Sequence, residues 1–461
     1  MSVPVRRRTA TVVGGVAAAL LLAACGSSGS GDTSSSAPAP SSSTPVVAGC
    51  EDYASYGSQP GTKVTVFTSI LPPEQQKFET SWAQFEKCTG IEVVYEGSDQ
   101  FEAQLPTRIQ GGNAPDIAFI PQPGLLKKLV QQGGPKPAPQ SVTDNVGKFW
   151  TEAWKNYGTV DGTFYAAPLS ANMKSFVWYS PKTFAAKGYT VPTTWDELFT
   201  LSDKMAADGV KPWCGGIESG GATGWLATDW IEQIVLRQQG GEAYDKWISH
   251  ELKFDSPEIK QAFTTLEGWM RNSKYANAGF GDTKTIATTA FQDGGKPILE
   301  GKCGMYQQAS FYANFWVNFD KKAEIGEDKD VFAFYLPAIS ADVTTPIVGG
   351  GEFVTAFADR PEVQAFQTYL ASDTFATLKV KEGTWVSANN GVPLDAYSDP
   401  ISALSAKYLT DSTATFRFDA SDLMPAAVGA GSFWTGMTAF FGENKSVDET
   451  VKAIDAAWPA S

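Results

Sequence analysis

Residues 63–120 decide the fold, and they begin with the run Lys63-Val64-Thr65-Val66-Phe67-Thr68-Ser69. The β-branched and apolar residues of this run predict a strand. After it we predict a helix, a strand, a second helix and a third strand, over residues 73–89, 91–95, 101–110 and 114–120. This alternation indicates an α/β fold in which a mainly parallel sheet is flanked by helices on both faces.

The polar residues that follow these strands are candidates for binding a ligand. Ser69, Asp99 and Gln122 lie at or just after the carboxyl ends of the three strands, which is the edge where parallel sheets bind their ligands. Asp116 is open to two interpretations, namely a carboxylate that grips hydroxyl groups and a structural cap or turn residue.

The rest of the chain predicts a second lobe, because about 415 folded residues exceed what one hydrophobic core usually serves. Residues 165–179 form a long extended stretch that suits a crossing between lobes. The run Gly349-Gly350-Gly351 is typical of a hinge, so Gly350 and the adjacent Glu352 are further candidates. Caps and apolar spacing predict helices that start near 194, 256, 360 and 446, with capping boxes at 194–197 and 446–449, and strands at 301–306 and 331–336.

The N-terminal residues predict an export signal. Arg6-Arg7-Arg8 precede an uncharged apolar run at 11–24, which is too short to span a bilayer comfortably. Leu22-Ala23-Ala24-Cys25 resembles a bacterial lipobox, in which the cysteine is acylated and becomes the first mature residue. The alternatives are an ordinary secretory signal with a chance cysteine and a cytosolic chain with an apolar start. Ser-, Gly- and Pro-rich residues up to 49 then predict a flexible tether, of about 25 Å for ~22 residues.

Composition excludes several functions. Loss of residues 1–24 would change the net charge from −14 to −17, with 33 basic and 50 acidic residues left, which is unsuited to nucleic acid. The single histidine, His250, cannot supply a multi-histidine metal site, and we interpret it as an ordinary surface or helix-end residue. No nucleophile elbow, phosphate loop or metal-ligand spacing is present, so we predict no metal and no cofactor.

The cysteines predict two disulfides. Cys25 belongs to the signal, which leaves four cysteines in an oxidising compartment and three possible connectivities. The first strand spans about 23 Å and the helix after it about 25 Å. The end of the helix should therefore return to the start of the strand. We predict the pair Cys50–Cys88 and, by exclusion, Cys214–Cys303.

Tryptophans and glycines mark a second candidate region. Trp213 and Trp225 flank a loop with five glycines and one carboxylate, Glu218. Glycines admit a ligand close to the backbone, a Trp face stacks on sugar C–H groups, and a carboxylate accepts hydrogen bonds from hydroxyl groups. The alternative is a stapled surface loop with packed tryptophans. Core packing is equally an alternative for three other stacking candidates, Trp178, Trp385 and Trp434.

The order of these motifs resembles the extracellular sugar-binding proteins of ABC importers, of which the maltose-binding protein is the best-known type. The resemblance covers nearly all of residues 63–458. Three motifs are most similar to the α-glucoside-binding branch, namely Val177-Trp178-Tyr179, the loop Trp213-Cys214-Gly215-Gly216 and Gly304-Met305-Tyr306. Its other motifs are Gly112-Asn113-Ala114-Pro115-Asp116-Ile117, Pro192-Thr193-Thr194-Trp195-Asp196-Glu197-Leu198, Met424-Pro425, Gly431-Ser432-Phe433-Trp434 and Ser446-Val447-Asp448-Glu449-Thr450-Val451.

This resemblance implies a class II periplasmic-binding-protein-like fold, in which two α/β lobes joined by three crossings close on a sugar. The crossings would lie near Ala171, Gly349 and Ala406. The implied organisation is a signal peptide at 1–24, a tether at 25–49, a first lobe at 50–171 and 349–405, and a second lobe at 172–348 and 406–461.

The resemblance also implies roles for particular residues. Trp434 matches the family's stacking aromatic residue, while Ser69 and Gln122 line the first lobe. Gln308 and Phe311 match the far wall of the second lobe. Asn172 departs from the pattern, because the maltose type has a carboxylate there.

We therefore expect a non-enzymatic, lipid-anchored receptor on the extracellular face of the cell membrane. It would act as a monomer, bind an α-glucoside or a similar di- or oligosaccharide, and deliver it to an ABC permease with a cytoplasmic ATPase. The alternatives are a different solute, such as a polyol, an amino sugar or a peptide, and a secreted glycoside hydrolase.

Overall fold

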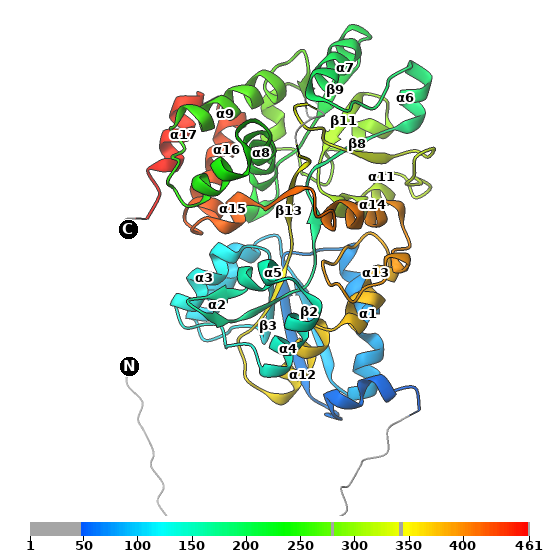
Figure 1. Ribbon diagram of the computed structural model, residues 1–461, viewed down its shortest axis with the longest axis vertical. Helices are drawn as coiled ribbons and strands as arrows, with labels where there is room; N and C mark the ends of the chain where they lie inside the picture. The colour runs from blue at the N-terminus through cyan, green and yellow to red at the C-terminus, as the bar shows by residue number, and fades with distance from the viewer. Residues whose placement is uncertain (1–47, 278–280, 341–343, 460–461) are drawn as a thin grey trace, which may run out of the picture. The chain divides into compact units, whose positions relative to one another are not determined.

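A five-stranded sheet organises the first lobe in the computed structural model, which describes residues 48–277, 281–340 and 344–459 (Figure 1). β1 pairs in parallel with β2 and with β3, whereas β14 pairs antiparallel with β3 and with β6. Four strands therefore run one way and one runs the other, which confirms the mainly parallel sheet. In sheet order the strands are β2 (Glu92–Gly97), β1 (Lys63–Thr68), β3 (Ile117–Ile120), β14 (Phe353–Ala356) and β6 (Ala166–Pro168).

The second lobe repeats this arrangement. β9 pairs in parallel with β10 and β11, and β8 pairs antiparallel with β11 and β12, so again one strand of five is reversed. Similar sheets in the two halves give the two-lobe α/β fold that the sequence predicts. The sheet order is β10 (Ala276–Asn277), β9 (Lys211–Cys214), β11 (Cys303–Gln307), β8 (Phe176–Tyr179) and β12 (Phe332–Tyr335).

A three-stranded sheet lies where the chain passes between the lobes. β13 (Pro346–Gly350) is its central strand, between β7 (Asn172–Met173) and β15 (Thr415–Phe418). Two of the predicted glycines, at 349 and 350, are therefore the last residues of β13, ahead of β14. Ala406, near which we predict the third crossing, is a buried residue of α14 (Pro400–Leu409). A small hairpin joins β4 (Thr159–Val160) and β5 (Thr163–Phe164).

Helices flank the sheets of both lobes. In the first lobe these are η1 (Glu51–Tyr56), α1 (Glu74–Thr89), α2 (Phe101–Gln110), α3 (Pro123–Gln131), α4 (Gln140–Phe149), α5 (Glu152–Tyr157), α12 (Pro361–Leu370), α13 (Asp373–Lys381) and η5 (Leu394–Ala396). In the second they are α6 (Pro181–Lys187), α7 (Trp195–Ala207), η2 (Gly220–Ala222), α8 (Trp225–Ile248), α9 (Pro257–Met270), η3 (Thr283–Ala287), α10 (Lys296–Leu299), η4 (Ser310–Asn314), α11 (Trp316–Phe319), α14, α15 (Ala420–Leu423), η6 (Val428–Phe433), α16 (Trp434–Gly442) and α17 (Val447–Asp455). Within the described ranges, no helix combines the length and apolar character needed to cross a membrane.

Of the two predicted capping boxes, one is complete and the other is altered. Ser446 and Glu449 form the full capping box at the start of α17. At α7, Thr194 accepts from the Glu197 N–H as predicted, but the Glu197 carboxylate accepts from Thr193 instead of closing the box on Thr194. The cap is therefore shared by two threonines.

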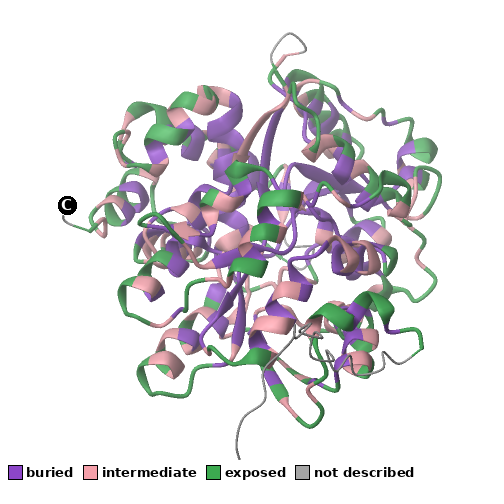
Figure 2. Cartoon of the chain, turned by 60° about the horizontal axis from the view of Figure 1, so that its bottom comes forward, coloured by how far each residue is buried: buried purple, intermediate pink, exposed green. Residues whose placement is uncertain are grey.

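Each lobe has its own hydrophobic core (Figure 2). In α1 the helical spacing of Phe78, Trp82 and Phe85 places all three side chains in the first-lobe core. Asp116 ties two strands of this lobe together, since its Oδ2 accepts from the backbone N–H and the hydroxyl of Thr65 and pairs with Arg360. That geometry supports the structural interpretation of Asp116.

Both predicted disulfides are present. Cys50 pairs with Cys88, which lies one residue before the end of α1, with a Cα–Cα distance of 5.4 Å. Cys214 at the end of β9 pairs with Cys303 at the start of β11, with a Cα–Cα distance of 5.9 Å. Cys25 and the predicted tether up to residue 47 lie outside the described residues.

Candidate ligand-binding site

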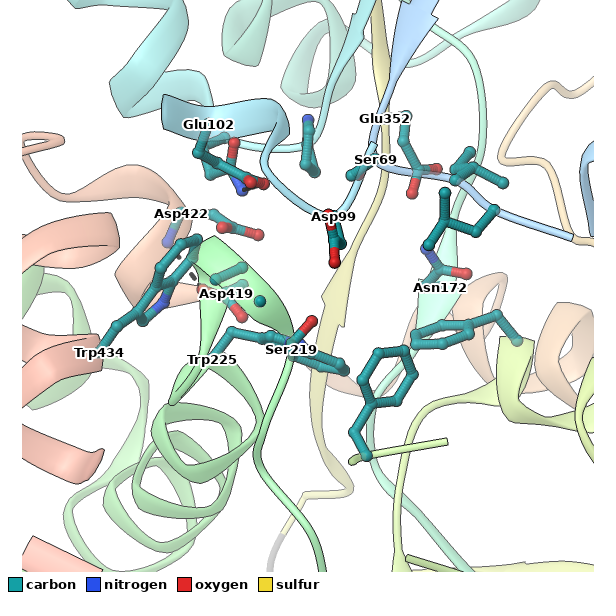
Figure 3. Close-up of a pocket in the computed structure, with 18 of the residues that line it drawn as sticks. Ser69, Asp99, Glu102, Asn172, Ser219, Trp225, Glu352, Asp419, Asp422 and Trp434 are labelled. Atoms are coloured by element: carbon teal, nitrogen blue, oxygen red, sulfur yellow. Dashed lines mark hydrogen bonds between the residues drawn. The ribbon is translucent and has the colours of Figure 1, made fainter. Parts of the chain in front are cut away.

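A cavity of about 250 Å³ lies between the carboxyl ends of the first-lobe strands and the facing loops of the second lobe (Figure 3). The loops after β1, β2 and β3 supply one wall, and the glycine loop before α8 supplies another. This placement follows the rule for parallel sheets. Nine of the candidate residues line the cavity: Ser69, Asp99, Gln122, Asn172, Glu218, Trp225, Phe311, Glu352 and Trp434.

Two candidate tryptophans lie outside the lining. Trp178 is fully buried, and its indole N–H donates to the backbone carbonyls of Gln308 and Ala309. Trp385 is 4% exposed and packs edge-on against Phe78 in the first-lobe core. Both rings therefore have the core-packing role that the sequence left open for them.

Two further candidates, Gln308 and Gly350, also lie outside the lining. Gln308 is fully buried, and its Oε1 accepts from the Ala309 N–H while its amide donates to the Tyr306 hydroxyl. Gly350 provides space, because a Cβ there would lie 3.0 Å from Cε of Lys174. The glycine thus admits the lysine side chain described below.

The sequence analysis did not identify several residues that line the cavity. Glu102 had a usable signal, because it lies in the first turn of the helix that follows Asp99. Lys174, Asp419 and Asp422 gave none, because they come together only in the folded chain. The other lining residues that the sequence did not single out are Ile70, Leu71, Glu74, Pro121, Ser219, Gly220, Ala222, Phe291, Gln292, Phe315, Gly351 and Ser421.

Aromatic rings form one side of the cavity. The ring centroid of Trp225 lies 5.2 Å from that of Phe291 and 6.0 Å from that of Phe311, and Phe315 extends the cluster. Gly224 positions Trp225 next to Trp434, because a Cβ at this residue would lie 2.2 Å from the Trp434 carbonyl oxygen. Gly224 also has φ = +110°, which favours glycine. The start of α8 and the start of α16 can therefore approach closely and present both tryptophans.

The two lobes touch at the rim of the cavity. The backbone N–H of Gly221 donates to the carbonyl of Asp99 across 3.0 Å. On the other side, Lys77 of α1 donates to Oδ1 of Asn314 at 2.9 Å, and Asn314 also bonds with Thr384. These bonds indicate a closed arrangement of the lobes.

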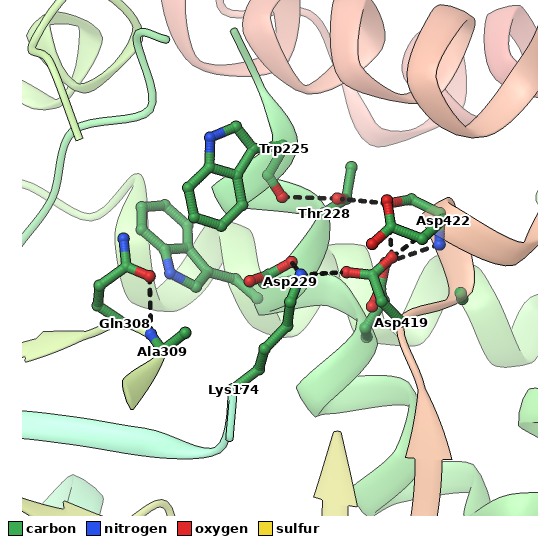
Figure 4. A network of polar contacts seen from close by, with 12 residues as sticks. Lys174, Trp225, Thr228, Asp229, Gln308, Ala309, Asp419 and Asp422 are labelled. Carbon is green, nitrogen blue, oxygen red and sulfur yellow. Dashed lines mark hydrogen bonds and ion pairs between the residues drawn. The ribbon is translucent and has the colours of Figure 1, made fainter. Parts of the chain in front are cut away.

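A buried ion network lies beneath Trp225 (Figure 4). Nζ of Lys174 is 2.9 Å from Oδ1 of Asp229 and 2.5 Å from Oδ2 of Asp419, and 5.4 Å from the Trp225 ring centroid. Burial lowers the pKa of Lys174, but the carboxylates of Asp229 and Asp419 outweigh it and hold the pKa well above its usual value. Carboxylate oxygens of Asp229, Glu232 and Asp419 lie within 4.8 Å of one another, a spacing that would suit a metal ion. The Lys174 ammonium already supplies a cation to this group.

Glu352 lies where the chain returns from β13 to β14. It bonds with the Ser170 hydroxyl, and the same hydroxyl accepts from the Glu352 N–H at 3.1 Å. Burial, followed by the charge of Glu74, raises the pKa of Glu352 to about 8. Near neutral pH the Glu352 side chain is therefore largely a protonated acid, able to donate as well as accept a hydrogen bond.

This pKa predicts how stability depends on pH. The folded-state pKa of about 8 lies above the unfolded value, so the contribution of Glu352 to stability is greatest below about pH 4.5 and is lost as the pH rises toward 8. In the Glu352→Gln variant the side chain at this position is an amide, which cannot ionise in this pH range. We therefore expect the Tm of the variant minus the Tm of the unmodified protein, both measured by circular dichroism, to increase as the pH rises from 5 to 8. A constant difference over this range would contradict the assignment.

The fold and the cavity between the lobes define a two-lobe solute-binding protein, in which a ligand is held between lobes that close on it. The family model for bacterial extracellular solute-binding proteins matches residues 70–377, about two thirds of the chain. The chain belongs to this family. Its members bind solutes without transforming them, so the protein is not an enzyme, and the glycoside hydrolase alternative is excluded.

Two curated relatives are similar over most of their length. The osmoprotective compounds-binding protein GgtB of Synechocystis sp. is 34% identical over 417 residues, which cover 90% of this chain and 96% of GgtB. The α-glucosides-binding periplasmic protein AglE of Rhizobium meliloti is 35% identical over 423 residues, which cover 89% of this chain and 90% of AglE.

Solved structures share the fold at low sequence identity. The bacterial solute receptor AcbH superposes with a TM-score of 0.72 at 18% identity, over 86% of this chain and 98% of AcbH. The RafE protein in complex with raffinose gives a TM-score of 0.66 at 18% identity, over 86% of this chain and 98% of RafE.

Proposed function

We propose that this protein is the saccharide receptor of an ABC importer, which binds an α-glucoside or a similar di- or oligosaccharide in the cavity and delivers it to the permease. The observation that carries the proposal is the composition of the cavity wall. Trp225 and Trp434 offer apolar ring faces, and carboxylate, amide and hydroxyl groups surround them. Sugars present both an apolar face of C–H groups and a rim of hydroxyl groups, so this wall complements them.

The relatives support this substrate class. AglE is named for binding α-glucosides, and GgtB for osmoprotective compounds. The cavity of about 250 Å³ is slightly smaller than the ~300–1,000 Å³ typical of ligand pockets, which favours a disaccharide over a longer oligosaccharide. Asn172 in the lining would offer the ligand an amide where the maltose type offers a carboxylate.

Delivery would follow the mechanism of hinge closure. A ligand that contacts both lobes stabilises the closed form, because those contacts exist only in that form. The permease subunits would then recognise the closed receptor. We further propose that Cys25 carries a lipid that anchors the receptor to the extracellular face of the membrane, with residues 25–49 as the tether and a monomeric body beyond it.

A titration tests the proposal directly. We expect trehalose, maltose, sucrose or another α-glucoside to bind with a saturable heat in isothermal titration calorimetry. Binding should also increase the free energy of unfolding by RT ln(1 + [L]/Kd) and so raise the Tm. The saccharide recovered afterwards should be chemically unchanged. Absence of heat and of any Tm shift across a panel of mono-, di- and trisaccharides would overturn the proposal.

A further inference from the structure

One end of the cavity gathers three hydrogen-bond acceptors, of which two are buried and one, on Glu102, is half-buried. Glu102 comes from α2 of the first lobe and Asp422 from α15 of the second, and Figure 3 shows their carboxylates near one another beside the ring of Trp434. Gln122 is only 4% exposed, and its amide donates to Oε1 of Glu102 at 3.1 Å. Its own carbonyl oxygen, Oε1, has no partner among the described residues. A buried acceptor without a donor is costly, so a donor that a ligand brings within its reach would stabilise this end of the cavity.

No basic side chain serves this end of the cavity. Seven carboxylic residues line the cavity, and Lys174 is the only basic residue among the lining. Lys174 already pairs with Asp229 and Asp419. Within the part of the chain that the structure describes, Asp422 has no ion pair, and its carboxylate accepts no hydrogen bond. Hydrogen-bond donors or a positive charge for these two carboxylates must therefore come from outside the chain, unless protons neutralise them.

Electrostatics agree with this description. Burial raises the pKa of Glu102. Burial and then the charge of Asp419 raise the pKa of Asp422, with a further contribution from Glu102 across the cavity, whereas Lys174 lowers it. In the empty closed form both groups therefore bind a proton more readily than ordinary carboxyl groups do, and a cation bound between them would oppose that protonation.

We infer that this end of the cavity binds a protonated amino group, so that the solute is an aminated saccharide rather than a neutral one. The inference rests on the proposed saccharide-binding function and narrows its substrate class. An ammonium group has three donors and no acceptor, which matches the three acceptors of Glu102, Asp422 and Gln122. The neighbouring Trp434 ring adds a cation–π surface. A neutral hydroxyl group supplies a single donor and no positive charge, so its hydrogen bond to a carboxylate is weaker than that of an ammonium group.

Matched ligands test the inference. We would titrate the protein by calorimetry near pH 6 with trehalose and maltose, and with derivatives of each in which one hydroxyl at position 2, 3, 4 or 6 is replaced by an amino group. At this pH an alkyl amine is protonated. We expect at least one amino derivative to bind about 10- to 100-fold more tightly than its parent, the range for a charge-assisted hydrogen bond.

Isosteric variants assign the effect to the two carboxylates. In Glu102→Gln/Asp422→Asn the shape of the site is kept and its charge removed, so the preference for the amino derivative should fall below about threefold. Glu92→Gln, on the exposed edge strand β2, is the matched control and should keep the full preference. Thermal denaturation verifies that each variant is folded. Equal affinity for every amino derivative and its parent, or a preference that survives the double substitution, would overturn the inference alone. Failure of all the saccharides to bind would overturn the proposed function as well.

Discussion

Trp434→Ala is expected to weaken saccharide binding by about 30- to 1,000-fold, the range for a buried aromatic residue that dominates a binding site. The Trp434 side chain is 3% exposed, lines the cavity and starts helix α16. Its indole N–H is buried and has no partner among the described residues, so a sugar oxygen placed beside it would gain a hydrogen bond. Alanine would remove both the stacking face and this donor. The dissociation constant for the tightest saccharide of the panel, from calorimetry, measures the loss.

Two further variants separate binding from folding. Trp434→Phe keeps an aromatic face without the N–H, so its affinity should lie between those of the unmodified protein and Trp434→Ala. Trp82→Phe changes a fully buried ring of the first-lobe core that does not line the cavity, and it should leave the dissociation constant unchanged. Unaltered affinity in a folded Trp434→Ala protein would contradict the stacking role.

Lys174→Met is expected to lower the free energy of unfolding by about 3–5 kcal/mol, the usual result of removing one partner from a buried ion network. The variant leaves Asp229 and Asp419 buried without their cation, and Oδ2 of Asp229 already lacks a partner among the described residues. Methionine fills a similar volume, so the cost comes mainly from electrostatics. Urea unfolding followed by circular dichroism measures the change.

A surface lysine provides the matched control. Lys182 pairs with Asp330 at 2.6 Å, but its side chain is 61% exposed. Lys182→Met should therefore lower stability by no more than about 1 kcal/mol. Adding Asp229→Asn and Asp419→Asn to Lys174→Met should recover part of the loss, because the orphaned charges are removed. A loss as small as that of the surface control would show that the network contributes little.

The sequence predicts best what depends on local pattern and sheet topology. Ser69, Asp99 and Gln122 follow successive parallel strands, whose carboxyl ends must meet at one edge, so their presence in the cavity wall follows from the order of the elements. The Cys50–Cys88 disulfide follows in the same way from the lengths of β1 and α1. Such predictions need no knowledge of which side chains pack together.

The sequence could not predict whether an individual side chain points into the cavity or into the core of its lobe. Trp178 and Trp434 have the same chemistry, yet the first is enclosed by its own lobe and the second lines the cavity. Lys174, Asp229 and Asp419 come from segments far apart in the chain, so no spacing rule relates them. The acceptors at Glu102 and Asp422 likewise come from opposite lobes, and only the folded chain brings them together.

The hydrogen bond between the Gly221 N–H and the Asp99 carbonyl has a consequence for how such receptors diverge. Both partners are main-chain atoms, so the bond tolerates changes in the side chains that line the cavity as long as Gly220 is kept, where a Cβ would lie 2.8 Å from the Asp99 carbonyl oxygen. Mutations in the cavity wall can therefore change the ligand specificity while the closed conformation stays the same. That conformation is the one presented to the transporter. During evolution, such receptors could acquire new ligands while the surface that docks on the permease is retained.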